Sequence, residues 1–385
     1  MRYVAPVKGS ELFHKWSCIA ILSAAIERKV WRQWHTERIY PNMYIVLSGK
    51  PGVGKTFSSR RAMDFVNKLN NKYKDKGIKT PTDKLTPASL IKQFKRAAKP
   101  LGKEQFHSLF SHADELSSFI LDIGGGSIAS DITKFFDCPD LFRKELARDT
   151  DELTVISNLS FSFLWDTTPT FLQRYLPKEI SGEGLLSRII FVTDLEGQPH
   201  DLIPPDPDWA LKARLDDYYE RIFQLRGEVK NSPEALEFLN SWYKNVYVPA
   251  HGQLAGAGPF ISYHARKPLH VIKLSMLMAL SRLSLVVSKQ DTERALELLN
   301  ELEPSMIEAF GLTDITGESD FAQVVMSFIG PHEVTEKELR RRLTKSSLFF
   351  AQGPRWDGLV SALKVDERFR VHSNGSGTLC FMRVK

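Results

Sequence analysis

The eight residues from Gly49 to Thr56, which read GKPGVGKT, constrain this chain more than any other stretch. An apolar, β-branched run from Tyr44 to Leu47 precedes them. A helical pattern through Ala62, Phe65 and Val66 follows them. We therefore expect a buried parallel strand, a glycine loop and a helix in direct succession, which is the context that G-x-x-x-x-G-K-[ST] requires.

This succession predicts a phosphate-binding loop. Glycines let backbone N–H groups turn towards phosphate oxygens, and the helix N-terminus adds partial positive charge. Lys55 is predicted to reach the β- and γ-phosphates of ATP, and the Thr56 hydroxyl to hold Mg²⁺. The alternative is a glycine-rich turn that caps a helix, which does not require the Lys-Thr pair. The predicted nucleotide contacts are Gly49, Pro51, Gly52, Val53, Gly54, Lys55, Thr56 and Phe57.

An acidic pair, Asp114-Glu115, follows a strand-like segment from His107 to Ala113. The pair predicts a second part of the same site, in which Asp114 holds Mg²⁺ through water and Glu115 polarises the attacking water. The alternative is an acidic cap on a helix that starts at Leu116. Asp122 is a rival for the magnesium role.

Another apolar strand, Leu159 to Trp165, ends in Asp166-Thr167-Thr168-Pro169. A polar residue at the carboxyl end of a central strand can reach the γ-phosphate side of a nucleotide site. We assign this role to Thr167, with Thr168 as the neighbour that would otherwise take it. The alternative is a turn started by Asp and Pro.

Three basic residues suggest contacts beyond one subunit's own nucleotide site. Arg188 stands just before the apolar strand at Ile189 to Val192. A guanidinium donated into a neighbour's site stabilises the transferring phosphoryl group, by roughly 10³–10⁵ in rate. A structural Arg that pairs with a carboxylate is the alternative. Lys144 and Arg148, in a basic turn, are candidate DNA-backbone contacts in a central channel, or else lie on a solvated charged turn.

Composition narrows the class of protein. A chain of 385 residues suggests about two or three domains, and no run of about eighteen apolar residues predicts a membrane span. The N-terminal stretch lacks the long apolar core of a signal peptide. Cys18, Cys138 and Cys380 are far apart and have no zinc-site spacing, so we interpret them as reduced thiols of a cytoplasmic protein.

Four regions are predicted along the chain. Residues 1–40 form an N-terminal helical extension, with a helix from Glu11 to Arg32, and residues 41–200 form the ATPase core. A proline-rich break at Pro199 to Pro207 marks the next boundary. Residues 201–317 form an α-helical lid and residues 318–385 a further domain. The helical patterns of the lid run over Trp209–Leu225, Pro233–Tyr243 and Ile261–Leu285, and a further helix begins near Ser288.

The last region reads as three short helices followed by a glycine-turned hairpin, which is typical of a winged helix. The predicted helices are Phe321–Ile329, Thr335–Leu343 and Trp356–Leu363. From Pro331 to Lys385 there are eleven Lys/Arg and six Asp/Glu, so the local charge of +5 favours a polyanion partner. A protein–protein module is the alternative. The candidate DNA contacts are Arg340, Arg341, Arg342, Lys345, Arg355 and Arg370.

Taken in order, these segments resemble an AAA+ ATPase of the helicase type, most of all the ATPase regions of minichromosome-maintenance proteins and of phage or mobile-element primase–helicases. The resemblance covers roughly Ile39 to Leu302. It rests on GKPGVGKT, Asp114-Glu115, the strand ending at Thr167, GLLSRI, Arg266 ahead of a long helix, and VVSKQDTERALELL. It implies an α/β fold: a parallel sheet flanked by helices, an α-helical lid and a C-terminal winged helix.

The resemblance also implies roles and partners. It implies an ATP-driven DNA helicase or translocase that works as a ring, expected to be a hexamer, in DNA replication of a phage or mobile genetic element. The implied partners are single-stranded DNA in a central channel, duplex DNA at the winged helix and a primase. Alternatives are a DNA-binding initiator, loader or transposition-type regulator that does not unwind, a winged-helix binding module, and a small-molecule kinase. The implied roles are Walker A for Lys55 and Thr56, Walker B for Asp114 and Glu115, sensor one for Thr167, arginine finger for Arg188, and second sensor on the lid for Arg266.

Overall fold

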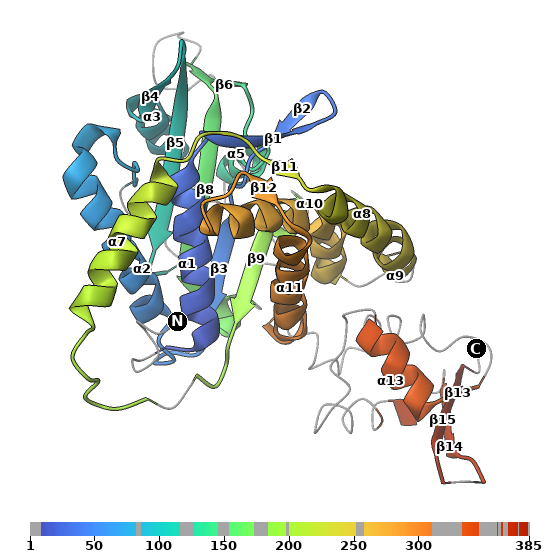
Figure 1. Ribbon diagram of the computed structural model, residues 1–385. Helices are drawn as coiled ribbons and strands as arrows, with labels where there is room; N and C mark the ends of the chain where they lie inside the picture. The colour runs from blue at the N-terminus through green and yellow to red at the C-terminus, as the bar shows by residue number, and fades with distance from the viewer. Residues whose placement is uncertain are drawn as a thin grey trace.

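The computed structural model describes most of the chain as a mixed α/β structure around a mostly parallel sheet (Figure 1). None of the helices in its described part is long and apolar enough to cross a membrane. The described residues are 9–81, 86–115, 127–144, 154–172, 184–197, 200–251, 258–309, 333–345, 360, 363–364, 369–375 and 377–383.

The central sheet has five strands in the order β4-β5-β8-β3-β9. All neighbouring pairs are parallel except β4 and β5, which form an antiparallel hairpin. The carboxyl ends of β5, β8, β3 and β9 therefore lie along one edge. The strands are β4 (Ala98–Leu101), β5 (Glu104–Ala113), β8 (Leu159–Thr167), β3 (Tyr44–Ser48) and β9 (Ile189–Thr193).

The strands β3, β8 and β9 are buried at every residue, as expected for parallel strands covered on both faces. A row of stacked rings crosses two of them: Tyr44 lies on Phe163 with 4.3 Å between ring centroids, and Phe163 lies on Trp165 with 3.7 Å. Trp165 also donates a 2.9 Å hydrogen bond to Ser111 Oγ on β5. This bond explains the polar residue that interrupts the apolar pattern of β5.

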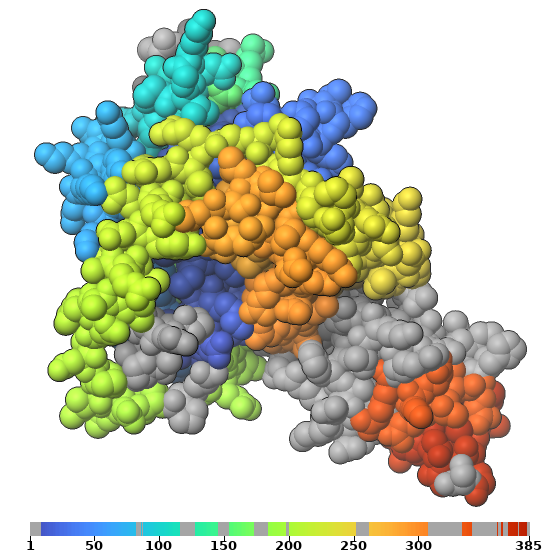
Figure 2. Space-filling view, in the orientation of Figure 1, coloured from blue at the N-terminus to red at the C-terminus, as the bar shows by residue number. Residues whose placement is uncertain are grey.

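Helices cover the sheet. The helix α1 contacts β3, β8 and β9, and α7 packs on α1 and α2 (Figure 1). In Figure 2 the blue surface of the N-terminal segment is visible between yellow-green α7 and the orange helices α10 and α11. The helices of this part are α1 (Glu11–Ile26), α2 (Lys55–Tyr73), α3 (Pro87–Arg96), α5 (Ser127–Phe135) and α7 (Trp209–Phe223).

The helices predicted for the lid are present with shifted ends, although the first of them, α7, packs on α1 and α2 instead. The helix α10 packs on α11 and on the short helix η3 (Leu186–Arg188), so this helical group also contacts the sheet region. Its helices are α8 (Pro233–Trp242), the π-helix η4 (Tyr243–Tyr247), α9 (Val248–His251), α10 (Gly258–Ser281) and α11 (Lys289–Ala309).

The predicted N-terminal helix is shorter than expected. It ends at Ile26 because Glu27 takes a φ of 56°, with its buried carboxylate paired to Lys29 and Lys99. The aromatic and β-branched run after it forms strand β1 (Val30–Trp34) instead, which pairs with β2 (Glu37–Ile39).

Two short parallel pairs tie distant segments together, and the first of them joins two regions that the sequence assigned separately. The strand β1 pairs with β10 (Gly227–Glu228), so Val30 lies opposite Gly227. The strand β11 (Lys230–Asn231) pairs with β12 (Val286–Val287). Residues near 30 and near 227 thus belong to one packed unit, although the proline-rich break lies between them in the chain.

In the C-terminal part the structure describes the helix α13, helical residues at 360, 363 and 364, and a three-stranded antiparallel sheet of order β13-β15-β14. The helix α13 and the hairpin β14–β15 lie where the sequence predicts a helix and a hairpin. The predicted helix at Phe321–Ile329 and most of that at Trp356–Leu363 lie outside the described residues. The elements are β13 (Val334–Thr335), α13 (Glu336–Lys345), β14 (Phe369–Ser373) and β15 (Leu379–Arg383).

Candidate functional site

The loop between β3 and α2 has the backbone that the glycines predict. Gly52 and Gly54 both have φ of 90°, in the left-handed region that favours glycine, and Gly54 is the N-cap of α2. A Cβ on Gly49 would lie 2.5 Å from the carbonyl oxygen of Asp194 and 2.8 Å from Val53. The tight approach of two chain segments therefore also requires a glycine at position 49.

Lys55 lies over this loop. Its ammonium donates hydrogen bonds of 2.6 Å to the Gly49 carbonyl and 3.0 Å to the Lys50 carbonyl. Burial lowers the pKa of Lys55, and the carboxylate of Asp166 opposes that shift. The side chain is thus held in the concave side of the loop, next to one negative charge.

Asp166, which the sequence pattern alone assigned to a turn, is hydrogen-bonded to α2, the helix that follows the loop. It is fully buried at the end of β8, and its Oδ2 accepts a 3.2 Å hydrogen bond from Ser59 Oγ. Burial raises the pKa of Asp166 to about 7, although hydrogen bonds from Thr56 and Ser59 oppose the shift. Within the described part of the chain, its Oδ1 has no hydrogen-bond partner.

The predicted acidic pair, Asp114 and Glu115, lies at the same edge of the sheet as Asp166, but its side chains line a cavity beside α2. Ala113 is level with Trp165, so Asp114 follows β5 beside Asp166, and its charge raises the pKa of Asp166 further. The carboxylate of Asp114 pairs with Arg60 on α2. Asp114 and Glu115 line an open cavity of about 540 Å³ between β5 and α2, together with Arg60, Met63, Asp64, Asn67, His112 and Ala113.

Thr167 takes the predicted position beside the loop. It is level with Ser48 on β3, and its carbonyl accepts a 3.4 Å hydrogen bond from Gly49 N. Among the described residues, its buried hydroxyl has no hydrogen-bond partner. Thr168 differs, because its hydroxyl accepts a 3.4 Å hydrogen bond from Phe171 N and so stabilises the following turn.

These residues fit a magnesium–triphosphate group. Mg²⁺ prefers oxygen ligands from hydroxyls, carboxylates and phosphates. The Thr56 hydroxyl and two carboxylates, Asp166 and Asp114, supply such oxygens at one edge of the sheet. The unpartnered, buried Oδ1 of Asp166 is the observation that argues most directly for a cation there.

Arg188 and Arg266 lie away from this site. Arg188 precedes β9, at the amino ends of the strands and roughly 15 Å along the sheet from the glycine loop. Its guanidinium donates a 2.9 Å hydrogen bond to the Gly184 carbonyl and lies 3.1 Å from Asp137 Oδ2, and only 9% of its side chain is exposed. Arg266, on α10, lies 3.7 Å from Asp137 Oδ1.

Asp137 therefore holds both arginines inside one chain, which corresponds to the carboxylate pairing named as the alternative for Arg188. The exposed fraction of the Asp137 side chain is 52%. A neighbouring molecule would have to displace this carboxylate before Arg188 could contact it.

Next to Asp137, a buried polar junction anchors α10. His270 Nε2 lies 3.0 Å from the Ser187 carbonyl, and burial lowers the pKa of His270 to about 4. Lys273 donates hydrogen bonds of 2.5 Å to Asn42 Oδ1 and 3.1 Å to the Phe136 carbonyl. These contacts fix the helix against the segment that carries Arg188.

Some of the candidate DNA contacts are described by the structure, and others lie outside its described residues. Lys144 lies on the hairpin of β6 (Leu141–Lys144) and β7 (Thr154–Ser157), and pairs with Asp131. Arg340 pairs with Glu336 at 2.8 Å on α13, and Arg370 is exposed on β14. Arg148 and Arg355 lie outside the described residues, and so do the side chains of Arg341, Arg342 and Lys345 on α13.

The chain was also compared with known proteins. No model of a known protein family matches it, and no curated protein sequence matches it either. The functional assignment therefore depends on the residues and contacts described above.

Proposed function

We propose that the protein is a P-loop ATPase of the AAA+ type that hydrolyses ATP with Mg²⁺ and acts on DNA as a ring-shaped helicase or translocase. One observation carries the ATPase part. The glycine loop with Lys55 lies at the strand edge where Thr56 and the buried Asp166 meet. A glycine-rich helix cap alone gives no reason for a desolvated carboxylate and a desolvated ammonium at the same place.

The chemistry follows from the residues of this edge. The backbone N–H groups of the loop and the ammonium of Lys55 bind the β- and γ-phosphates. Thr56 and Asp166, with Asp114 nearby, would hold Mg²⁺, which neutralises charge on the phosphate oxygens when bound. Glu115 orients the attacking water and accepts its proton, and Thr167 donates to the γ-phosphate side.

The ring and DNA parts rest on the resemblance and on two supporting features. Arg188 is roughly 15 Å along the sheet from its own loop, so an Arg188 finger can serve only the site of another copy. Lys144 lies on a hairpin between the acidic pair and the Thr167 strand, as expected for a loop that faces a central channel.

The second candidate is a DNA-binding initiator, loader or transposition-type regulator that hydrolyses ATP without unwinding. Two contacts favour it. Asp137 holds Arg188 within its own chain, and Asp131 holds Lys144. An ATPase whose finger and hairpin become available only on assembly behaves as a switch.

The test compares Lys55→Ala with Lys76→Ala. Lys76 is an exposed lysine just past the far end of α2, roughly 30 Å from Lys55 along the helix axis. We expect ATP hydrolysis with Mg²⁺ and single-stranded DNA to be lost in Lys55→Ala and kept in Lys76→Ala. Equal hydrolysis in the two variants would refute the ATPase proposal. Unwinding of a forked duplex by the wild type then separates the helicase from the regulator.

A further inference from the structure

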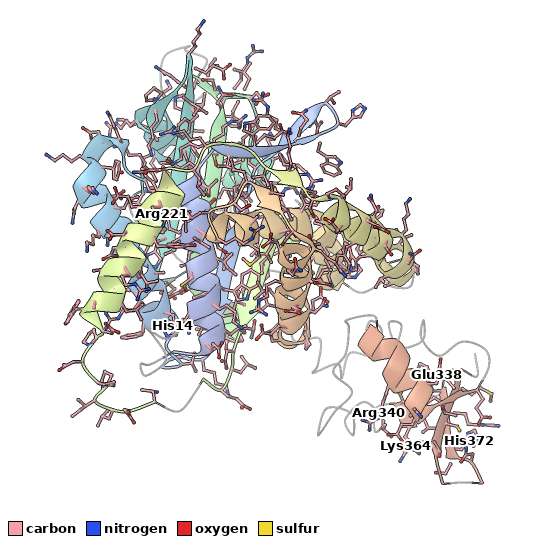
Figure 3. The ribbon with its side chains drawn as sticks, viewed as in Figure 1. His14, Arg221, Glu338, Arg340, Lys364 and His372 are labelled. Atoms are coloured by element: carbon pink, nitrogen blue, oxygen red, sulfur yellow. The ribbon has the colours of Figure 1, made fainter. Side chains whose placement is uncertain are left out.

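The small C-terminal sheet brings together three residues with different ligand chemistry. Cys380 on the central strand β15 lies directly opposite His372 on β14 and opposite Thr335 on β13. Glu333 immediately precedes β13. The Cys380 sulfur, an imidazole nitrogen of His372 and a Glu333 carboxylate oxygen all lie within 4.8 Å of one another. Figure 3 labels His372 on the hairpin.

All three residues belong to one face of this sheet. Side chains alternate along a strand, so Val334, Val371 and Phe381 share the other face, where Val334 and Phe381 are buried. On the ligand face Cys380 is buried, while the side chains of His372 and Glu333 remain 41% and 48% exposed. The thiol therefore lies below an imidazole and a carboxylate that solvent reaches from one side.

We propose that Glu333, His372 and Cys380 bind one Zn²⁺ ion, with a water molecule in the fourth position. Thiolate, imidazole and carboxylate are the ligand types that zinc takes in tetrahedral sites. Bond lengths of about 2.0–2.3 Å place tetrahedral ligand atoms about 3.3–3.8 Å apart. His372 Nε2 and Glu333 Oε1 are already 3.6 Å apart, so the site needs a closure of at most about 1.5 Å at the sulfur.

Binding forms a Zn–S bond at the expense of the S–H bond of Cys380, and the proton goes to solvent. The ion would connect all three strands of the sheet. The strand β13 has only two paired residues, Val334 and Thr335, and a tie through Glu333 would hold it to β14 and β15. This site lies on other elements than the glycine loop, so the inference does not depend on the proposed ATPase activity.

The test titrates the metal-free full chain with Zn²⁺ in competition with a chromophoric chelator. We expect one tight site in the wild type, weakened at least about 100-fold by Cys380→Ser and by His372→Ala. The matched controls are Cys18→Ser and Cys138→Ser, which remove the other two thiols and leave the affinity unchanged. The wild type with Co²⁺ should show a sulfur-to-cobalt charge-transfer band, which Cys380→Ser removes.

Glu333→Gln tests the proposal even if the other variants misfold, because Glu333 is half-exposed and precedes a strand, so its substitution should not disturb folding. It should weaken zinc binding at least about tenfold and keep the cobalt–thiolate band. Absence of tight zinc binding in the wild type would overturn the proposal. So would equal zinc affinity in the wild type and the Cys380, His372 and Glu333 variants.

Discussion

Ser59 donates a 3.2 Å hydrogen bond to the carboxylate of Asp166, which joins the helix after the glycine loop to the end of a neighbouring strand. The same carboxylate bonds to Thr56 and faces the charge of Lys55. Asp166 thereby connects the loop lysine, the loop threonine and the strand next to the loop strand. It is a stronger candidate than Asp114 for the group beside Thr56.

The first prediction concerns Asp166→Asn. In the wild type the pKa of Asp166 is raised to about 7, so the stability that the protonated form supplies is complete below pH 3.8 and is lost as pH rises through 7. At about pH 8 the variant should lose Mg²⁺-dependent ATP hydrolysis but unfold at higher urea, with a gain of up to about 4 kcal/mol. Initial rates of ATP hydrolysis measure the first effect, and urea titrations without nucleotide measure the second.

Asp75→Asn, which changes a fully exposed aspartate after α2, is the control for that experiment. It should alter neither quantity. A destabilised but fully active Asp166→Asn protein would mean that the buried carboxylate is structural and has no part in the reaction.

The second prediction concerns Arg188 and Asp137. Arg188→Ala should abolish ATP hydrolysis by the assembled protein, and Asp137→Asn should raise it several-fold, because the arginine is then free to contact a neighbour. Mixing Arg188→Ala with Glu115→Gln should restore part of the activity, since some interfaces then combine an intact arginine with an intact acid. Steady-state hydrolysis at a series of mixing ratios measures this. Full ATPase activity of Arg188→Ala would show that Arg188 is not an arginine finger.

The third prediction concerns pH. Burial lowers the pKa of His270 from 6.5 to about 4, so the unfolded chain binds more protons than the folded one between these values. The stability from neutral His270 is complete above pH 6.5 and is lost as pH falls towards 4, by about 3 kcal/mol. His270→Gln should flatten this part of the profile of unfolding free energy against pH. An unchanged slope in the variant would assign the acid sensitivity to other groups.

The fourth prediction compares two glycines of one loop. Gly49→Ala forces a methyl group against the Asp194 carbonyl and should destabilise the protein by about 3 kcal/mol. Gly52→Ala meets no atom within 4 Å, so only its left-handed backbone is strained, at about 1 kcal/mol. Thermal unfolding without nucleotide measures both. Equal losses would mean that close packing at position 49 is relieved by a shift of the loop.

The glycine loop, its strand and its helix could be predicted because the information is local. The residues from Tyr44 to Val66 carry the strand pattern, the turn residues and the helical period in one window. The hairpin around Gly375 is local in the same way. In contrast, the sequence predicted a helix up to Arg32, because Ile26 and Val30 continue a helical spacing that the backbone at Glu27 breaks.

The partners of the functional candidates could not be predicted, because they are distant in sequence. Asp137 is 51 residues from Arg188, and no periodic pattern relates the two. Asp166 looked like the first residue of a turn, although its position directly after a long apolar strand was the available signal. Its burial depends on β8 lying between β3 and β5, which only the sheet order reveals.

The pairing of Val30 with Gly227 has a consequence during synthesis. Ribosomes add about 5–20 residues per second, so strand β1 emerges roughly 10–40 s before its parallel neighbour exists. Over that interval the far side of β1 has an unsatisfied row of backbone donors and acceptors, beside an exposed Trp34. The nascent chain is most open to chaperone capture or to aggregation while the residues between these two strands are being translated.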